Sequence, residues 1–478
     1  MKKIFALLST ILILASCAEF TELQPKGKNL LSTTDELELL LNTDYYLWDT
    51  DWFQMTGDMM YQFSNVPNLL SLPTPSRAAI MYAWDDSKMD KMAELTASDN
   101  SYSDIFGFVG RIANPILNQV ERATGDQAKK DQLKAEAYTL RAFSEFLLVN
   151  KFAAAYNPST AANTPGIPYL MEDWDISQPT EQWSVGAVYD QIVADCDAAI
   201  ALNALPVNAI NQMRINKACP YAVKALALMS MQKFDEAAAA AQQVLSMQSD
   251  VVNLTDAAHT QIVQGYIIGG QYPAVYRPKI ATEEDIWMIA DNSIFNAITT
   301  EGETRFEPGN VMLTRFASDR MMYDYFMGMG TSYLGLDYTL TFDQESYWNR
   351  FGLRTVQMYL ILAECEINKG NYDTAMKYLD IIRVNRIEPT MYAPLQGTVT
   401  SKADAILHLK QVAHGEGFLG PYNFINRKRW NLLNDYKETF TRDIAGKTYS
   451  LTPDSKMWIF PFPMNAMNNN PNLKHNCL

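Results

Sequence analysis

Two stretches of the sequence combine aromatic side chains with polar ones. Aromatic rings offer flat faces on which a ligand can stack, while carboxylates, amides and guanidinium groups can hydrogen-bond its polar groups. The first stretch supplies Trp48, Asp49, Trp52, Tyr82, Trp84 and Asp85. The second stretch supplies Tyr272, Tyr276 and Arg277. We expect part of this set to contact a ligand, although packing in a core or loop is the commoner role of any single aromatic residue.

The same stretches offer less to metal ions or to catalysis. Asp49 and Asp51 could contribute to a calcium site, but the other oxygen ligands of an EF-hand loop are missing, which favours a solvated loop. The chain has 54 acidic residues, so accidental carboxylate pairs are frequent and none is marked as that of a glycosidase. GxSxG, HExxH and P-loop patterns do not occur, and histidines number only four. We therefore predict no catalytic residue, cofactor or metal.

Charge and composition narrow the class of ligand. Hydrophobic residues make up 48% of the chain and charged residues 19%, which is typical of a globular protein. The formal net charge is −15. Nucleic acid and anionic membrane surfaces are therefore excluded as ligands of the folded body.

The N-terminus has the pattern of a bacterial lipoprotein leader. Lys2 and Lys3 precede an apolar run, residues 4–14, that is too short to span a bilayer, and Leu14-Ala15-Ser16-Cys17 fits a lipoprotein cleavage box. We predict a signal peptide over residues 1–16 and a palmitate-type lipid anchor on Cys17. A plain secretory leader that happens to end in cysteine is the alternative.

The remaining cysteines show no metal-binding spacing. They are Cys196, Cys219, Cys365 and Cys477. No pair has CxxC spacing and few histidines could serve as co-ligands, so buried free thiols are favoured. A single disulfide in an oxidising compartment is the alternative, and the sequence does not choose its partners.

Helical hairpins must position the aromatic stretches. Between Arg354 and Arg386 apolar side chains follow a 3.6-residue period, which Gly370 and Asn371 interrupt at a turn. A second hairpin begins at Pro220 and ends near Leu245, and both second helices start with an aromatic-Asp-x-x-Ala sequence. Such pairs resemble tetratricopeptide units.

The longest helical pattern runs from residue 131 to about residue 155. It places Arg141 and Glu145 four residues apart, which predicts an ion pair on the side of the helix.

The order of these patterns predicts one body over residues 17–478 without a clear domain boundary. A tether over 17–32 leads into a helical part over 33–250, which carries the aromatic loops 44–104. A loop-rich lobe with short strands follows over 251–347. Residues 348–478 contain the C-terminal helical hairpin and a proline-rich tail that we expect to wrap around the surface.

Several short motifs, in their order along the chain, resemble the SusD/RagB family of Bacteroidota. Besides the leader and the hairpins, these motifs are Ala135-Glu-Ala137, Leu140-Arg-Ala142, Lys428-Arg-Trp430, Pro461-Phe-Pro463 and Asn470-Pro-Asn-Leu473. The resemblance implies a mainly α fold in which about four tetratricopeptide-like units support a loop-rich lobe.

The resemblance also implies a function. It implies a non-catalytic lipoprotein of the outer membrane that faces the cell exterior, binds an oligosaccharide and delivers it to a TonB-dependent transporter of the SusC type. A peptide-binding or adaptor role for the helical repeats is the alternative, because tetratricopeptide grooves commonly bind peptides. A surface glycosidase is the third alternative.

Overall fold

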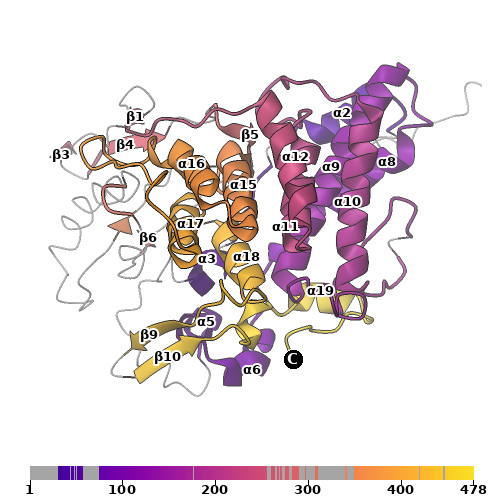
Figure 1. Cartoon of the computed structure of the whole chain (residues 1–478). Coiled ribbons are helices and arrows are strands. Elements are labelled where there is room, and N and C mark those ends of the chain that lie inside the picture. The colour runs from indigo at the N-terminus through magenta and orange to yellow at the C-terminus, as the bar shows by residue number, and fades with distance from the viewer. Residues whose placement is uncertain are drawn as a thin grey trace, which may run out of the picture.

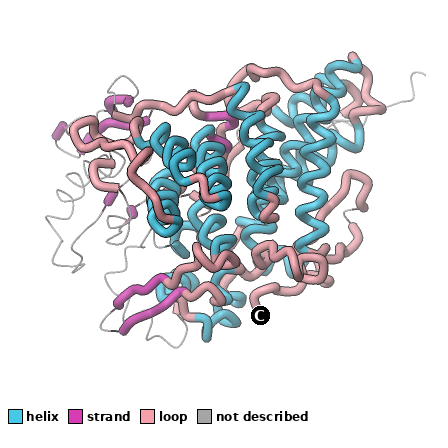
Figure 2. The backbone as a smooth tube through the Cα atoms, in the orientation of Figure 1, coloured by secondary structure: helices cyan, strands magenta, loops and turns pink. Residues whose placement is uncertain are grey.

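The computed structural model describes most of the chain beyond the leader. The described residues are 31–43, 45–47, 49, 51–56, 75–175, 177–255, 260–263, 266–267, 270–271, 275–278, 283–289, 296–297, 307–310, 340–341, 349–418, 420–444 and 447–478. Within them the structure is mainly α-helical with a few short strands, as predicted (Figure 2).

The frame is a row of paired helices that pack side by side. In chain order these are α9 (Gln127–Phe152), α10 (Val185–Leu202), α11 (Cys219–Ser230), α12 (Phe234–Met247), α15 (Thr355–Lys369), α16 (Tyr372–Arg383), α17 (Lys402–Glu416) and α18 (Pro421–Trp430). Figure 1 shows the row running from α9 and α10 through α11 and α12 to α15, α16 and α17. Both predicted hairpins are confirmed, and Gly370 ends α15 with a left-handed φ of 82°.

Shorter helices from the N-terminal and C-terminal ends of the chain pack around this frame. They are α2 (Thr34–Leu41), α3 (Asp51–Thr56), α5 (Arg77–Ala83), η1 (Asp86–Lys88), α6 (Met89–Glu94), α7 (Ser101–Phe108), the π-helix η2 (Val109–Ala113), α8 (Asn114–Gln119), η5 (Lys456–Trp458) and α19 (Met464–Asn469). Of these, α7 and η2 pack on α9.

The described strands form antiparallel pairs. These pairs are β1 (Thr260–Val263) with β4 (Val275–Pro278), β2 (Tyr266–Ile267) with β3 (Gly270–Gln271), β5 (Asp285–Trp287) with β8 (Leu353–Arg354), β6 (Asn296–Ala297) with β7 (Leu340–Thr341), and β9 (Phe440–Ile444) with β10 (Lys447–Leu451). Short strands were predicted for the loop-rich lobe, and those that the structure describes there fit this expectation.

The C-terminal tail does not run only over the surface as the sequence predicts. Phe460 and Phe462 are fully buried, and the Phe462 ring stacks on Phe152 with 5.2 Å between the ring centroids. The Phe460 N–H donates to the carbonyl of Lys151 at 3.0 Å. The aromatic residues between the prolines thus seal the C-terminal end of α9, because a chain without helical periodicity can still bury its rings against an existing helix.

The predicted ion pair on α9 is wrong. Arg141 binds Asp195 of α10 through two hydrogen bonds of 2.6 and 2.9 Å, and it also bonds Glu172 at 2.7 Å. Glu145 is buried, and among the described residues neither of its carboxyl oxygens has a hydrogen-bond partner. This face of α9 lies against α10, so Arg141 pairs across the helix interface.

The four cysteines of the described body are buried and free, as predicted. No described helix is long and apolar enough to cross a membrane.

Candidate ligand-binding site

The tryptophans of the first aromatic stretch that the structure describes lie in the interior. Trp52 is 0% exposed, and its ring packs edge-on against Phe424 at a centroid distance of 5.4 Å. Trp84 is 4% exposed, and its indole N–H donates to the carbonyl of Met55 at 2.8 Å. Neither ring presents a face to a ligand in this structure, because α3, which contains Trp52, and α5, which ends at Trp84, pack into the core.

Asp49 and Asp51 are held by cations of the protein itself. Lys151 Nζ lies 2.6 Å from Asp49 Oδ2 and 2.8 Å from Asp51 Oδ2, and Arg77 adds two hydrogen bonds to Asp51 at 3.0 and 2.7 Å. Burial raises the pKa of Asp49 to about 6 despite Lys151. Burial acts the same way on Asp51, but Arg77 and Lys151 together lower the pKa of Asp51 to about 2. The solvated loop predicted for these residues is wrong.

Tyr82 and Asp85 keep partial exposure at the edge of this region. The guanidinium of Arg442 in β9 lies 4.4 Å from the ring centroid of Tyr82 and 3.8 Å from that of Trp84. Asp85 caps η1 and pairs with Lys88 at 3.3 Å. Ligand contact by Tyr82 and Asp85 stays a prediction.

The other predicted site residues are described in part or not at all. Trp48, Tyr272 and Cys17 lie outside the described residues. Tyr276 and Arg277 lie in β4, where they pair in register with Ile262 and Gln261 of β1, and their side chains are not described. Their roles stay predictions.

A cavity that contains none of the predicted site residues lies between α7, the π-helix, the segment 168–180 and α19. Its volume is about 440 Å³, within the range of roughly 300–1,000 Å³ that is usual for ligand pockets. We call it the amide cleft. Its lining consists of Tyr102, Ser103, Phe106, Gly107, Gly110, Arg111, Pro168, Leu170, Trp174, Gln178, Thr180, Asn465, Ala466, Asn469, Asn470 and Leu473.

The aromatic wall of the amide cleft comes from α7 and the loop after α9. Tyr102 and Phe106 are four residues apart on α7, and their rings stack with centroids 5.8 Å apart. Trp174 is 44% exposed, which is unusual for so large an apolar side chain. These three rings provide the flat faces that a sugar binder needs.

The opposite wall comes from α19 and is rich in amides. Asn470 clamps this wall to the segment before α10, because its side chain donates to Thr180 Oγ1 at 2.8 Å and accepts from the Thr180 N–H at 3.2 Å. Asn469 donates to the Asn465 carbonyl at 2.8 Å. Within the described part of the chain, Asn465 Nδ2 and Asn469 Oδ1 have no hydrogen-bond partner and remain available to a ligand.

The π-helix shapes the floor of the amide cleft. π-helical turns are rare and often lie at functional sites, because the extra residue displaces side chains from their α-helical positions. Here the turn carries Arg111, whose guanidinium lies over Gly107. A Cβ atom on Gly107 would be only 2.1 Å from Arg111 Nη2, so the position of the guanidinium depends on the missing side chain.

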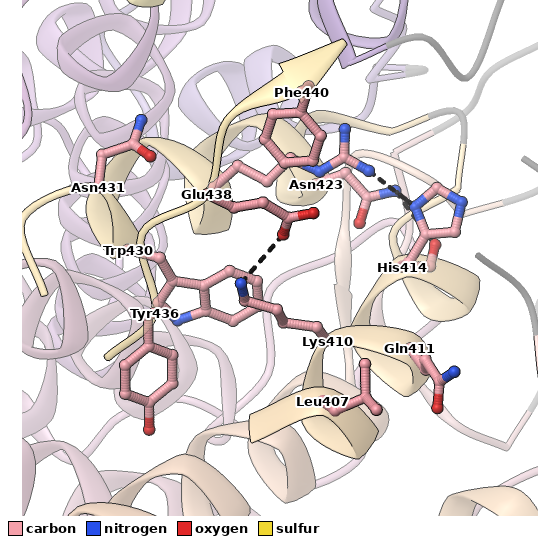
Figure 3. Close-up of a pocket in the computed structure, with 11 residues that line it drawn as sticks. Leu407, Lys410, Gln411, His414, Asn423, Trp430, Asn431, Tyr436, Glu438 and Phe440 are labelled. Atoms are coloured by element: carbon pink, nitrogen blue, oxygen red, sulfur yellow. Dashed lines mark hydrogen bonds and ion pairs between the residues drawn. The ribbon is translucent and has the colours of Figure 1, made fainter. Parts of the chain in front are cut away.

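A second pocket, between α17 and α18, is less suited to a ligand (Figure 3). We call it the His414 pocket, and its volume is about 150 Å³. Lys410 Nζ bonds Glu438 Oε2 at 3.0 Å, and Arg427 Nη2 lies 3.0 Å from His414 Nδ1. A guanidinium only donates, so His414 Nδ1 accepts and Nε2 carries the proton. These polar groups already bond one another, whereas in the amide cleft Asn465 Nδ2 and Asn469 Oδ1 keep no partner among the described residues.

Sequence reasoning missed the amide cleft. Asn470-Pro-Asn-Leu473 entered only as a motif of the family resemblance, and Tyr102 fell within the predicted aromatic loops 44–104. The available signal was the density of asparagine between residues 465 and 472 in a segment that cannot form a long helix. Nothing in the sequence pairs that segment with Trp174, since the two are nearly 300 residues apart.

The described structure is thus a row of helical pairs with a cleft that combines aromatic rings and amide groups. Residues 59–228 match the family model SusD-like_3, described as "Starch-binding associating with outer membrane". No curated protein sequence matches the chain.

Solved structures share the fold over nearly the whole chain. A putative sugar binding protein from Bacteroides vulgatus superposes with a TM-score of 0.66 at 16% identity, covering 94% of this chain and 99% of that one. A SusD superfamily protein from Bacteroides thetaiotaomicron gives 0.65 at 16% identity, covering 93% and 99%. Surface glycan-binding protein A from Bacteroides uniformis gives 0.62 at 15% identity, covering 93% and 100%. The family-model match over residues 59–228 and this shared fold agree with the resemblance to the SusD/RagB family that the sequence motifs show.

Proposed function

We propose that this protein binds an oligosaccharide without cleaving it and that the amide cleft is a binding site for the sugar. The observation that carries the proposal is the pairing, in one cavity of about 440 Å³, of the exposed Trp174 ring with unoccupied amide groups on α19. A sugar ring can stack on the indole while Asn465 and Asn469 bond its hydroxyl groups.

Binding without catalysis agrees with the lining of the amide cleft. Glycoside hydrolysis uses two carboxyl groups that flank the scissile bond. The described residues around the cleft include neither Asp nor Glu, and neither His nor Cys. The chemistry that they offer is stacking and hydrogen bonding, which permits capture and release.

Location and partner follow from the leader and the family resemblance. The matching family model is described as associating with the outer membrane. The leader ending in Cys17 supports a lipid anchor, and the resemblance supports a position facing the cell exterior. On the same basis, the protein would deliver its sugar to a SusC-like TonB-dependent transporter.

Titration calorimetry of the purified body, from residue 18 onward, against a panel of neutral and acidic oligosaccharides tests the proposal. At least one glycan should bind. Trp174→Ala should weaken that binding about 3- to 10-fold, which corresponds to the roughly 0.5–1.5 kcal/mol of a ring contact, without lowering the melting temperature. Asn469→Ala should also weaken it.

Two exposed residues outside the cleft supply matched controls. Tyr46→Ala removes another exposed ring and Lys410→Ala removes a side chain of the His414 pocket, and both should leave affinity unchanged. Binding of peptides but of no glycan would overturn the proposal in favour of a peptide-binding repeat. Hydrolysis of a bound glycan would overturn the non-catalytic assignment.

A further inference from the structure

We propose that the amide cleft selects an acidic sugar, a uronic acid residue whose carboxylate binds Arg111. This inference rests on the proposed glycan-binding function and adds the chemical class of the ligand. Three features of the described structure support it: the charge of the cleft, the availability of the Arg111 guanidinium, and the geometry that holds it.

The lining of the amide cleft is positively charged in an otherwise acidic protein. The chain carries a formal net charge of −15, yet Arg111 is the only charged residue among the described residues that line this cavity. A neutral sugar needs no such cation, because amides and hydroxyl groups are sufficient for its hydroxyl groups. A single arginine between apolar rings and amides matches a ligand with one negative group per sugar ring.

The Arg111 guanidinium is available to bind a ligand. No hydrogen bond or ion pair joins it to another residue in the part of the chain that the structure describes. Asp104 lies on α7, on the N-terminal side of Arg111. Burial raises the pKa of Asp104, and the positive charge of Arg111 partly opposes this rise. Of the acidic residues on the neighbouring loop, Glu172 bonds Arg141 at 2.7 Å and Asp175 accepts from a backbone N–H. None of these carboxylates lines the cleft.

The π-helix and Gly107 place the guanidinium. Arg111 lies on the π-helical turn, and its Nη2 occupies the space where a Cβ of residue 107 would be. The guanidinium therefore lies over Gly107 of α7, and the Arg111 side chain stays exposed to solvent and to a ligand. A planar guanidinium in this position can make two parallel hydrogen bonds to the carboxylate of a ring that stacks in the cleft.

The test compares acidic oligosaccharides with their carboxyl-reduced forms, in which the carboxylate has become a neutral hydroxymethyl group. Oligogalacturonate, oligoalginate and glucuronoxylan fragments supply three such pairs. By titration calorimetry at low salt, at least one acid should bind about fivefold or more tightly than its reduced partner. Raising the salt to 0.5 M should shrink this preference, because the charges are close to solvent.

Two variants separate charge from position. Arg111→Gln should abolish the preference for the acid over its reduced form. Gly107→Ala should reduce the preference by displacing the guanidinium, although the substitution suits a helix and should not lower the melting temperature. Arg122→Gln is the control, since Arg122 is exposed just after α8 and bonds Asn118 instead of lining the cleft.

The outcomes distinguish this inference from the proposed function. If neutral and acidic forms bind equally, or if the preference survives Arg111→Gln, the inference is wrong and glycan binding stands. Preference for a sulfated oligosaccharide that lacks uronic acid over every uronate would also overturn it. If no glycan of either kind binds, the proposed function fails and the inference fails with it.

Discussion

Removal of the Lys151 ammonium group should destabilise the fold strongly and in a pH-dependent way. The Lys151 side chain is 0% exposed, and its Nζ lies 2.6 Å from Asp49 Oδ2 and 2.8 Å from Asp51 Oδ2. It also lies 5.1 Å from the ring centroid of Phe460. Lys151→Met keeps much of the volume of the side chain and deletes only the charge that compensates two buried carboxylates.

The magnitude follows from the partners that remain. Arg77 still holds Asp51 through two hydrogen bonds, so Asp49 is the carboxylate left uncompensated. Stranding one member of a buried ion pair costs about 3–5 kcal/mol. Asp49 can escape part of this cost by binding a proton, because burial already raises its pKa to about 6 with Lys151 present.

The sign of the pH dependence follows from that pKa. The folded pKa of Asp49 exceeds the unfolded value of about 3.9, so the folded state retains a proton that the unfolded state has lost. The stability that this proton provides is present at low pH and is lost as the pH rises through the folded pKa. Without Lys151 the folded pKa rises further, and the cost of Lys151→Met should therefore be larger at pH 7.5 than at pH 5.

Urea unfolding followed by circular dichroism at these two pH values measures the effect. The matched double variant, Lys151→Met with Asp49→Asn, removes the stranded charge and should recover most of the lost free energy of unfolding at pH 7.5. A cost below about 1 kcal/mol at pH 7.5, the level of a surface pair, would refute the reasoning. So would a double variant no more stable than Lys151→Met alone.

Three further substitutions test other buried groups. Trp52→Ala should lower the free energy of unfolding by about 3–5 kcal/mol, and Trp52→Phe should cost less, as measured by urea unfolding; equal costs would contradict core packing. Glu145→Met should raise the melting temperature at pH 7.5, because it removes a buried carboxyl group that has no hydrogen-bond partner among the described residues. Burial raises the pKa of this carboxyl group well above its ordinary value. A lower melting temperature would contradict this. Burial lowers the pKa of Lys428 to about 7, so the unfolded state binds more protons than the folded state between pH 7 and 10. The free energy of unfolding should therefore rise with pH in this range. A Lys428→Met variant whose free energy of unfolding rises equally steeply with pH would refute this.

The sequence was sufficient for the helical frame because local signals specify it. Gly370 ends the first helix of the Arg354–Arg386 hairpin, and apolar residues repeat every three to four positions on both of its helices, so each element can be recognised without its neighbours. The free cysteines were also predicted, since no pair has metal-binding spacing and Cys196, Cys219 and Cys365 lie in or beside predicted helices.

Pairing between distant segments could not be predicted. Lys151 and Asp49 are about 100 residues apart, and nothing in either neighbourhood indicates that an aspartate will be buried beside a lysine. Asp49 was therefore assigned to a solvated loop, and Trp52 was included among the predicted ligand-binding residues. The same reason explains why Arg141 was paired with its helical neighbour instead of Asp195.

The amide cleft escaped prediction because three parts of the chain build it. Trp174, α7 and α19 are each ordinary in sequence, and only the fold brings rings and amides to opposite walls of one cavity. The π-helical turn that places Arg111 has no recognisable sequence signal, since its residues continue the apolar period of α7.

A crystal structure of the protein with an oligosaccharide that it binds in solution tests the central claim most directly. We predict a sugar ring stacked on Trp174, with hydroxyl groups bonded to Asn465 and Asn469 across the amide cleft. A sugar bound only outside this cleft, for example against Tyr82 and Arg442 or in the His414 pocket, would contradict the account.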